Sequence, residues 1–149
     1  MKIKILIPVY NDFQSVSKLI NDINSVISNL NEEFSIIIIN DASTEKTEID
    51  ISNLDKISSI KIINMRENRG HARCNATGLK YIFENEEFDY VIPMDGDGED
   101  RPEEISKFIE FLKYDNMKPI VGERIKRSED FIFKISYNIH KLITFIFTG

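Results

Sequence analysis

The sequence predicts an α/β fold with a mainly parallel sheet flanked by helices. Short runs rich in β-branched residues alternate with segments in which apolar residues recur at helical spacing. One of these runs, residues 34–39 (FSIIII), is apolar at consecutive positions, which is typical of a strand covered by helices on both faces. The chain has 149 residues and is 42% hydrophobic, which suffices for one domain with a buried core.

Four strands are expected, at residues 3–9, 34–39, 60–65 and 90–94, and a fifth short strand is expected around residues 119–121. Three helices are expected where apolar residues recur three and four positions apart, at residues 16–27, 72–84 and 105–112. The third helix is expected to begin after Pro102, because Glu103 and Glu104 then fall in its first turn and suit the helix dipole.

The charge is unevenly distributed along the chain. With 19 basic and 25 acidic residues the net charge is 19 − 25 = −6, and because residues 124–149 carry +3, the first 123 residues carry −9. This balance argues against broad nucleic-acid binding, which rests mainly on Lys and Arg. We expect a core at residues 1–130 and an amphipathic C-terminal helix at residues 131–149.

The cysteine content and the hydropathy of the chain indicate its compartment. Cys74 is the only cysteine, so neither an internal disulfide nor a cysteine-based zinc site is expected. The first apolar stretch is too short for a signal peptide, and no run reaches the roughly 18 apolar residues of a membrane span. We therefore expect a cytoplasmic location.

Polar residues follow each of the four predicted strands. The carboxyl ends read Tyr-Asn-Asp (10–12), Asn-Asp-Ala-Ser (40–43), Arg-Glu-Asn-Arg-Gly (66–70) and Asp-Gly-Asp-Gly-Glu-Asp (95–100). Asn, Asp and Gly are common in turns, so any single loop is explained by turn formation. Ligands of open parallel sheets bind beyond the carboxyl ends of the strands, so four such loops together favour a shared site.

The loop after the fourth strand holds four carboxylates within six residues. Two such charges about 4 Å apart repel by roughly 4 kcal/mol at an effective dielectric near 20, so in a cleft they require a cation or a raised pKa. Asp95 and Asp97, two residues apart, point the same way from extended backbone and can share a hard ion such as Mg²⁺ or Mn²⁺. Gly96 between them is expected to leave room for a ligand.

Three other functional interpretations of this loop fit the sequence poorly. A calcium-binding loop starting at Asp95 would need Gly at position six and Glu at position twelve, where the chain has Asp100 and Ser106. A dinucleotide-binding fingerprint lacks its third glycine. A phosphoacceptor receiver domain would need an Asp after the third strand, where the chain has Arg66-Glu67. From the motif alone, a metal site and a solvated acidic turn both stay open.

Five short motifs follow one another along the chain: Ile7-Pro8-Val9-Tyr10-Asn11-Asp12, Ile39-Asn40-Asp41-Ala42-Ser43, Asn68-Arg69-Gly70, Met94-Asp95-Gly96-Asp97 with Pro102-Glu103, and Gly122-Glu123-Arg124. In combination they resemble glycosyltransferase family 2, nucleotide-sugar transferases of the GT-A fold. Their order and spacing are most similar to the branch that transfers a sugar to a polyprenyl phosphate, such as dolichol-phosphate mannose synthases. Each motif is weak alone, but together they extend from Ile7 to Arg127.

The resemblance implies a role for each matching residue. Pro8, Tyr10 and Asp12 would line the nucleoside pocket, and Asp41 would accept a hydrogen bond from the base. Asp95 and Asp97 would form the Asp-x-Asp motif, in which Mg²⁺ or Mn²⁺ bridges the protein and the donor diphosphate. Arg124 would neutralise phosphate charge. Asp97 and Asp100 are candidates for a catalytic base, but the sequence does not decide which residue takes this role. His71 is expected to be a partly exposed histidine at a helix start.

The implied reaction is transfer of a sugar, with inversion, from a UDP- or GDP-type donor to an acceptor such as a polyprenyl phosphate. The apolar tail at residues 131–147, interrupted by Lys134, His140 and Lys141, would suit contact with the inner face of the membrane or a homo-oligomer contact. We expect the chain to cover the donor-binding half and to end where acceptor recognition begins. The alternative is a nucleotide-sugar-binding module without catalysis.

Overall fold

The computed structural model describes residues 1–46, 48–49, 54–114, 120 and 122. Contacts divide the chain into two units, Met1–Asn116 and Met117–Gly149, and the described helices and strands all belong to the first unit. These elements, in chain order, are β1 (Lys2–Val9), α1 (Phe13–Val26) followed by a 3-10 turn (Ile27–Asn29), β2 (Glu33–Asn40), β3 (Ile57–Asn64), α2 (His71–Asn85), β4 (Tyr90–Pro93) and α3 (Glu104–Tyr114).

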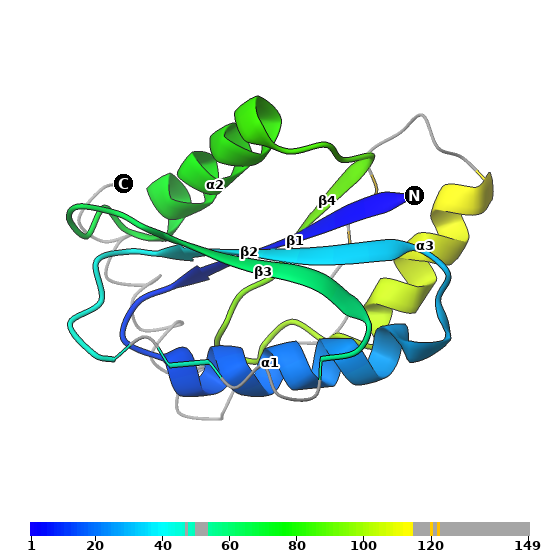
Figure 1. The fold of residues 1–149 in the computed structure, drawn as a ribbon, viewed down its shortest axis with the longest axis horizontal. Coiled ribbons are helices and arrows are strands. Elements are labelled where there is room, and N and C mark those ends of the chain that lie inside the picture. Colours follow the sequence, from blue (N-terminus) through cyan, green and yellow to red (C-terminus); the bar gives the residue numbers. More distant parts are fainter. Residues whose placement is uncertain (47, 50–53, 115–119, 121, 123–149) are drawn as a thin grey trace, which may run out of the picture. The chain divides into compact units, whose positions relative to one another are not determined.

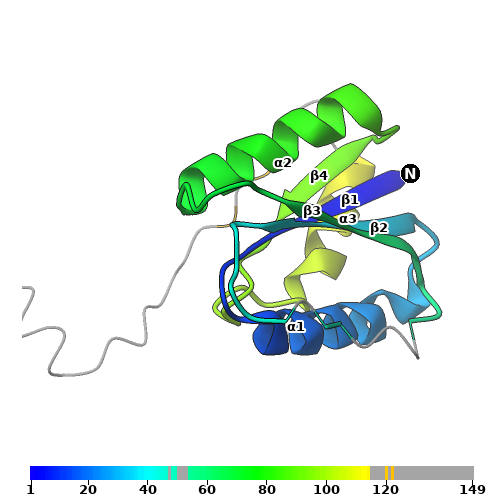
Figure 2. The same ribbon diagram turned by 60° about the vertical axis from the view of Figure 1, so that its left-hand side comes forward.

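The four strands form one sheet in the order β3-β2-β1-β4, and every pair is parallel. Helix α2 covers one face of the sheet, and α1 and α3 cover the other (Figures 1 and 2). This arrangement confirms the predicted α/β class with a parallel sheet flanked by helices. Because all four strands run the same way, their carboxyl ends lie at one edge of the sheet.

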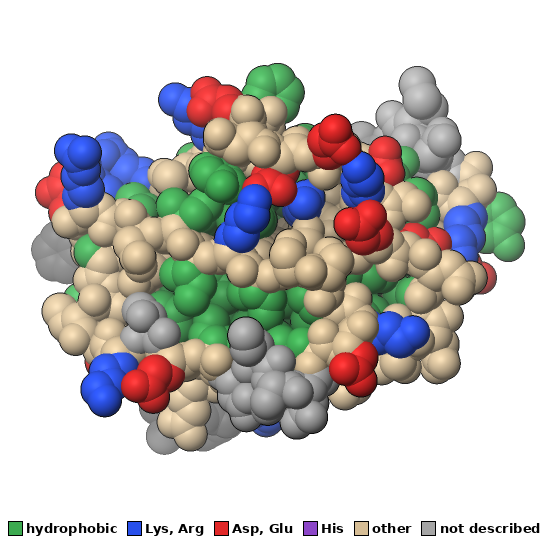
Figure 3. Space-filling view, in the orientation of Figure 1, with side chains coloured by type: hydrophobic (Ala, Val, Ile, Leu, Met, Phe, Trp, Pro, Cys, Tyr) green, Lys and Arg blue, Asp and Glu red, His purple; other side chains and the backbone are tan. Residues whose placement is uncertain are grey.

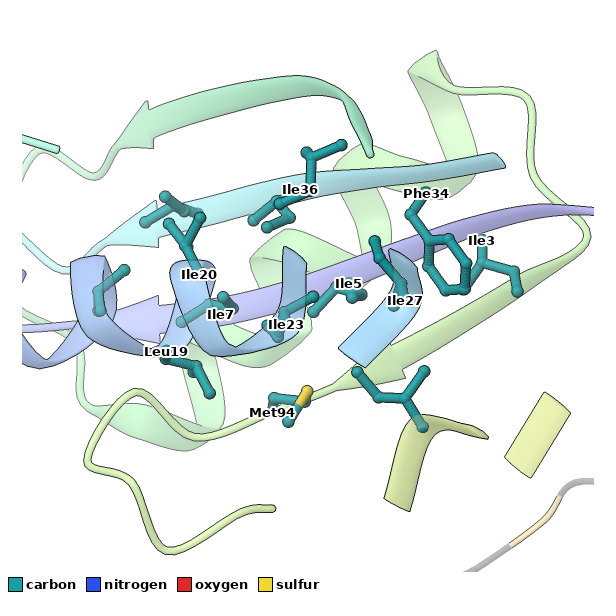
Figure 4. Close-up of a cluster of buried hydrophobic side chains, with 14 of the residues drawn as sticks. Ile3, Ile5, Ile7, Leu19, Ile20, Ile23, Ile27, Phe34, Ile36 and Met94 are labelled. Carbon is teal, nitrogen blue, oxygen red and sulfur yellow. The ribbon is translucent and has the colours of Figure 1, made fainter. Parts of the chain in front are cut away.

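The main core lies between the sheet and the pair α1 and α3. Alternate residues of β1 and β2 point into it, and the apolar stripe of α1 packs against them (Figure 4). Thirteen isoleucines in the described part of the chain are at least 98% buried, as are Leu6 and Phe34. Each contributes roughly 1.5–3 kcal/mol of burial free energy, so the central strands anchor the loops that follow them.

The element boundaries differ from the sequence prediction by up to three residues, and two of the differences have a clear structural reason. Strand β3 begins at Ile57 rather than residue 60, because a β-bulge at Ser58 lets the polar residues before Ile60 pair with β2. The Ser58 hydroxyl donates to the Phe34 carbonyl oxygen at 2.8 Å, which gives this oxygen a hydrogen-bond partner at the bulge. Helix α3 begins at Glu104, so Glu103 lies in the turn before it rather than in its first turn.

Some predicted features lie outside the described residues. These are the fifth strand, for which only Ile120 is described, the residue Arg124, and the proposed C-terminal helix at residues 131–149 with the boundary after residue 130. Among the helices that the structure describes, none is long and apolar enough to cross a membrane. Acidic and basic side chains are interspersed on the face of the molecule seen in Figure 3.

A charged cluster joins the C-terminal end of α2 to the sheet. The Glu86 carboxylate pairs with Lys4 of β1 at 3.0 Å and with Lys61 of β3 at 2.5 Å, and the Glu86 and Lys4 side chains are only 10% and 12% exposed. The hydrogen bond from Lys61 is the main cause that lowers the pKa of Glu86 below its ordinary value, and Lys4 lowers it further. The Glu86 carboxylate therefore bridges β1 and β3, which lie on either side of β2, and connects both strands to the end of α2.

This cluster predicts a loss of stability in acid. A carboxyl whose pKa is lower in the folded than in the unfolded chain stabilises the fold above its unfolded pKa of about 4.3, and this contribution disappears as the pH falls through the folded pKa. In chemical unfolding measured from pH 7 to pH 3, Glu86→Gln should be less stable than wild type at pH 7, and the difference should shrink toward the acidic end. A difference that stays constant over this range would contradict the assignment.

Candidate donor-binding site

The loops after β1 and β2 are joined by the side chain of Asn11. Its Oδ1 accepts hydrogen bonds from the backbone N–H of Thr44 at 2.8 Å and of Glu45 at 3.4 Å. The backbone N–H of Asn11 donates to the Ser43 hydroxyl at 2.9 Å. Ser43 is itself held by Asn40, whose side-chain oxygen accepts from the Ser43 N–H at 2.9 Å. The two loops thus form one hydrogen-bonded unit.

The carboxylate of Asp41 joins the end of β2 to the start of α2. One oxygen accepts from the Arg69 N–H and the other from the Gly70 N–H, both at 2.8 Å, and Asp41 is only 3% exposed. These bonds anchor the turn at which Gly70, with φ of 81°, begins the helix. Beside this turn, the Asn40 amide donates to Asn64 Oδ1 at 2.8 Å, which links the ends of β2 and β3.

Ala42 adopts a left-handed backbone conformation with φ of 58°, as does Asn11 with φ of 52°. Asparagine tolerates this region, but the alanine Cβ approaches the following carbonyl and costs roughly 1–2 kcal/mol. Strain of this kind is concentrated in loops that the surrounding structure holds in a fixed shape, often at binding sites. Here the fixed shape comes from the bonds that Asn40, Asp41 and Asn11 make.

Replacing Ala42 by Gly should stabilise the protein by about 0.5–1 kcal/mol, because the relief of strain exceeds the added chain entropy of glycine. Ala76→Gly on the exposed face of α2 is the matched control, and it should cost about 1 kcal/mol. Chemical unfolding of both variants measures the difference. A stability loss of equal size in the two variants would contradict the strain assigned to Ala42.

Two carboxylates of the acidic loop after β4 (residues 95–100) accept hydrogen bonds from backbone N–H groups of the same loop. Asp100 accepts a hydrogen bond from the Asp95 N–H at 2.8 Å, and Asp97 accepts one from the Glu99 N–H at 2.9 Å. A Cβ on Gly96 would lie 2.9 Å from Val16 Cγ2 and 3.4 Å from the Pro8 carbonyl oxygen. Gly96 is therefore needed for close approach of the loop to β1 and α1, which corrects the expectation that it leaves room for a ligand.

The acidic loop meets the first residue of α2. His71 Nε2 lies 3.4 Å from Asp95 Oδ1 and 2.9 Å from the Asn75 amide nitrogen, and the His71 and Asp95 side chains are 60% and 48% exposed. Desolvation raises the pKa of the Asp95 carboxyl, and Asp100, Asp97 and Glu99 raise it further, while His71 opposes the shift. The loop is thus an accessible, strongly negative feature at the edge where the other loops converge.

The donor set of this loop fits a divalent cation. Desolvation raises the pKa of Asp95, the neighbouring carboxylates raise it further, and a hard cation would stabilise the charged form of these groups. Within the described ranges no three His, Cys, Asp or Glu side chains converge on a common point. Mg²⁺ is typically held by one or two carboxylates, with substrate phosphates and water completing its coordination. Two carboxylates such as Asp95 and Asp97 are therefore enough protein ligands for such an ion.

The structure brings most of the predicted site residues to this edge. Tyr10 is 51% exposed at the end of β1, and Asp12 caps α1 by accepting from the Ser15 N–H at 3.1 Å. Pro8 and Asp41 also lie at this edge and are buried. Of the two candidates for a base, Asp100 is bonded to the Asp95 backbone, and Asp97 is bonded within its own loop.

The chain matches the family model described as "Glycosyl transferase family 2" over residues 4–147, and it belongs to this family. The match extends over the described core and most of the residues beyond it.

Two solved structures show how far the fold is shared. A crystal structure of S. aureus TarS 1–349 in complex with UDP-GlcNAc is 21% identical, with a TM-score of 0.61, over 86% of this chain and 38% of that one. The mannosyltransferase PcManGT from Pyrobaculum calidifontis, in complex with GDP-Man and Mn²⁺, is 19% identical, with a TM-score of 0.59, over 92% of this chain and 37% of that one. At these identities the likeness establishes the GT-A fold. The chain spans less than two fifths of either protein.

Proposed function

We propose that this chain binds a nucleoside-diphosphate sugar at the carboxyl edge of its sheet and serves the donor side of a metal-dependent glycosyl transfer. The observation that carries the proposal is the position of the Asp95–Asp100 loop, which meets the start of α2 where Asp95 lies 3.4 Å from His71. Membership of the family and a fold shared with proteins crystallised with UDP-GlcNAc and with GDP-Man and Mn²⁺ support it.

The residues divide between the nucleoside and the diphosphate. Tyr10 and Asp12 are exposed on the loop after β1, where an aromatic face and a carboxylate suit a base and a ribose. We assign Pro8 and Asp41 to the same pocket. Asp41 already accepts two backbone N–H groups, and its two oxygens have further lone pairs with which to accept from a base. Arg124 is proposed to neutralise phosphate charge.

Asp95 and Asp97 would hold Mg²⁺ or Mn²⁺, and the chain's net charge explains why a cation is required. The first 123 residues carry −9, so a diphosphate at this edge would be repelled without one. When bound, the ion supplies Lewis-acid stabilisation of the leaving diphosphate. The acceptor oxygen attacks the anomeric carbon as the bond to the diphosphate breaks, which inverts the configuration.

A polyprenyl phosphate is the proposed acceptor, at the cytoplasmic face of a membrane. A phosphate oxygen is already a nucleophile and needs little help from a base, which agrees with the internal hydrogen bonds of Asp97 and Asp100. The motif order from Ile7 to Arg127 supports this branch of the family. A second copy of the chain is proposed to associate through residues 131–149, whose apolar composition suits such a contact.

Release of nucleoside diphosphate tests the proposal. The chain is incubated with UDP-GlcNAc or GDP-Man and Mn²⁺, with and without a polyprenyl phosphate in detergent. Release that depends on Mn²⁺ and increases with the lipid supports the transferase. Metal-dependent binding of the nucleotide without any release supports the alternative, a donor-binding module that needs further chain for catalysis.

A further inference from the structure

We propose that Asn11 is a positioning residue which holds the nucleoside side of the site in its binding-competent shape. The inference rests on the proposed nucleotide-sugar function and names a residue that contacts protein backbone rather than ligand. It starts from the observation that one side-chain oxygen joins the two loops to which the nucleoside contacts are assigned. One loop carries Tyr10 and Asp12, and the other carries Asp41.

Asn11 both accepts hydrogen bonds from the loop after β2 and donates one to it. Its Oδ1 accepts from the Thr44 N–H at 2.8 Å, and its own N–H donates to the Ser43 hydroxyl at 2.9 Å. Asn11 makes both bonds at φ of 52°, a conformation that asparagine tolerates better than most residues. The neighbour Tyr10 is thereby fixed between buried Val9 and a residue tied to the other loop.

The loop that Asn11 holds is also anchored at Ile49, which packs against the main core. Thr44, Glu45 and Lys46 are exposed. An open groove of about 760 Å³ separates this segment from the first turns of α1, and it is lined by Phe13, Gln14, Ser17, Glu45, Lys46, Glu48 and Ile49. Because the groove leaves space beside Glu45 and Lys46, the bonds from Asn11 help to fix the position of Thr44 and Glu45. Without them, the strained Ala42 at φ of 58° has a route to relax.

A site whose binding-competent shape is populated for only a fraction of the time loses apparent affinity by that fraction. Asn11→Gly keeps the left-handed backbone and removes the side-chain oxygen, so it isolates the bonds from the conformation. Asn11→Asp restores an oxygen that accepts from both N–H groups. Asn11→Gly should weaken the affinity for UDP or GDP, measured with Mn²⁺, by about tenfold, and Asn11→Asp should recover most of it.

Amide hydrogen exchange in the same variants tests whether Asn11 holds the two loops together. Exchange at Thr44 should be several times faster in Asn11→Gly than in wild type, and slow again in Asn11→Asp. A purely structural role of Asn11 would change the melting temperature of Asn11→Gly without changing KM for the donor. Loss of an interaction that stabilises the bound donor and the transition state equally raises KM and leaves kcat nearly constant. The expected pattern is fast Thr44 exchange, weak nucleotide binding and a raised KM in Asn11→Gly only.

Two outcomes overturn the inference while leaving the proposed function intact. Either Thr44 exchange is unchanged in Asn11→Gly, or exchange is faster while the nucleotide affinity of Asn11→Gly equals that of wild type. If wild type binds neither UDP nor GDP, the proposed function itself fails and the role of Asn11 in binding fails with it. The wild-type titration therefore separates the two failures.

Discussion

Replacing Asp97 by Asn is expected to lower metal-dependent release of nucleoside diphosphate by about 100-fold or more. The change removes one charged oxygen from the proposed metal pair but keeps the shape of the side chain, and its amide oxygen still accepts from the Glu99 N–H. Stabilisation by a catalytic metal is worth several kcal/mol, and each 1.4 kcal/mol is a factor of about ten in rate. The rate is measured with Mn²⁺ and a nucleotide sugar.

Asp22→Asn is the matched control for this variant. Asp22 is exposed on α1, outside the loop, so the control removes the same charge from the acidic chain without touching the site. It should leave the rate within about twofold, since exposed charges interact weakly across water. Equal losses in Asp97→Asn and Asp22→Asn would mean that net charge, rather than a metal held by Asp97, governs the reaction.

The largest effect on stability is expected from Gly78→Val in α2. A Cβ at this position would lie 2.3 Å from Leu6 Cδ1 and 2.9 Å from Ile39 Cγ1, and both of these side chains are fully buried in the sheet. The valine would force α2 away from β1 and β2, and overpacking of this kind costs about 1–3 kcal/mol. Chemical unfolding measures the loss of free energy.

Ala76→Val, two residues away and exposed on the same helix, gives the cost of placing valine in α2 without a clash. That cost is less than about 0.7 kcal/mol from helix propensity. The difference between the two variants isolates the contact between α2 and the sheet. If Gly78→Val were no less stable than Ala76→Val, the close approach of α2 would be contradicted. Displacement of α2 should also weaken nucleotide binding, because Asp41 anchors the turn that leads into this helix.

Much of the fold was predictable because its signals are local. The consecutive isoleucines of β2 and the apolar stripe of α1 are patterns within one element, and both elements lie where the sequence places them. The start of β3 was not predictable, because Ser58 and Ser59 are polar. Ser59 joins the sheet through pairing with Ser35 of β2, and Ser58 through the bond from its hydroxyl to the Phe34 carbonyl oxygen. Pairing between distant segments leaves no periodicity in either of them.

The candidate site was predictable as a set of residues but not as a set of contacts. The positions of Tyr10, Asp12 and the acidic loop follow from strand ends in a parallel sheet. The burial of Asp41 against two backbone N–H groups, the tie made by Asn11 and the meeting of His71 with Asp95 depend on how loops cross in space. The only local sign of the Asn11 contacts in the sequence is an asparagine in a turn, and asparagine is common in turns generally.

Calorimetric titration of the wild-type chain with UDP and with GDP, each with Mn²⁺ and with EDTA, tests the central claim most directly. We predict that one of the two nucleotides binds with Mn²⁺ and that EDTA weakens this binding at least about tenfold, because a diphosphate at an edge this acidic needs a cation. Binding of neither nucleotide, or binding that is equal with Mn²⁺ and with EDTA, would contradict a metal-assisted nucleotide-sugar site at the carboxyl ends of these strands.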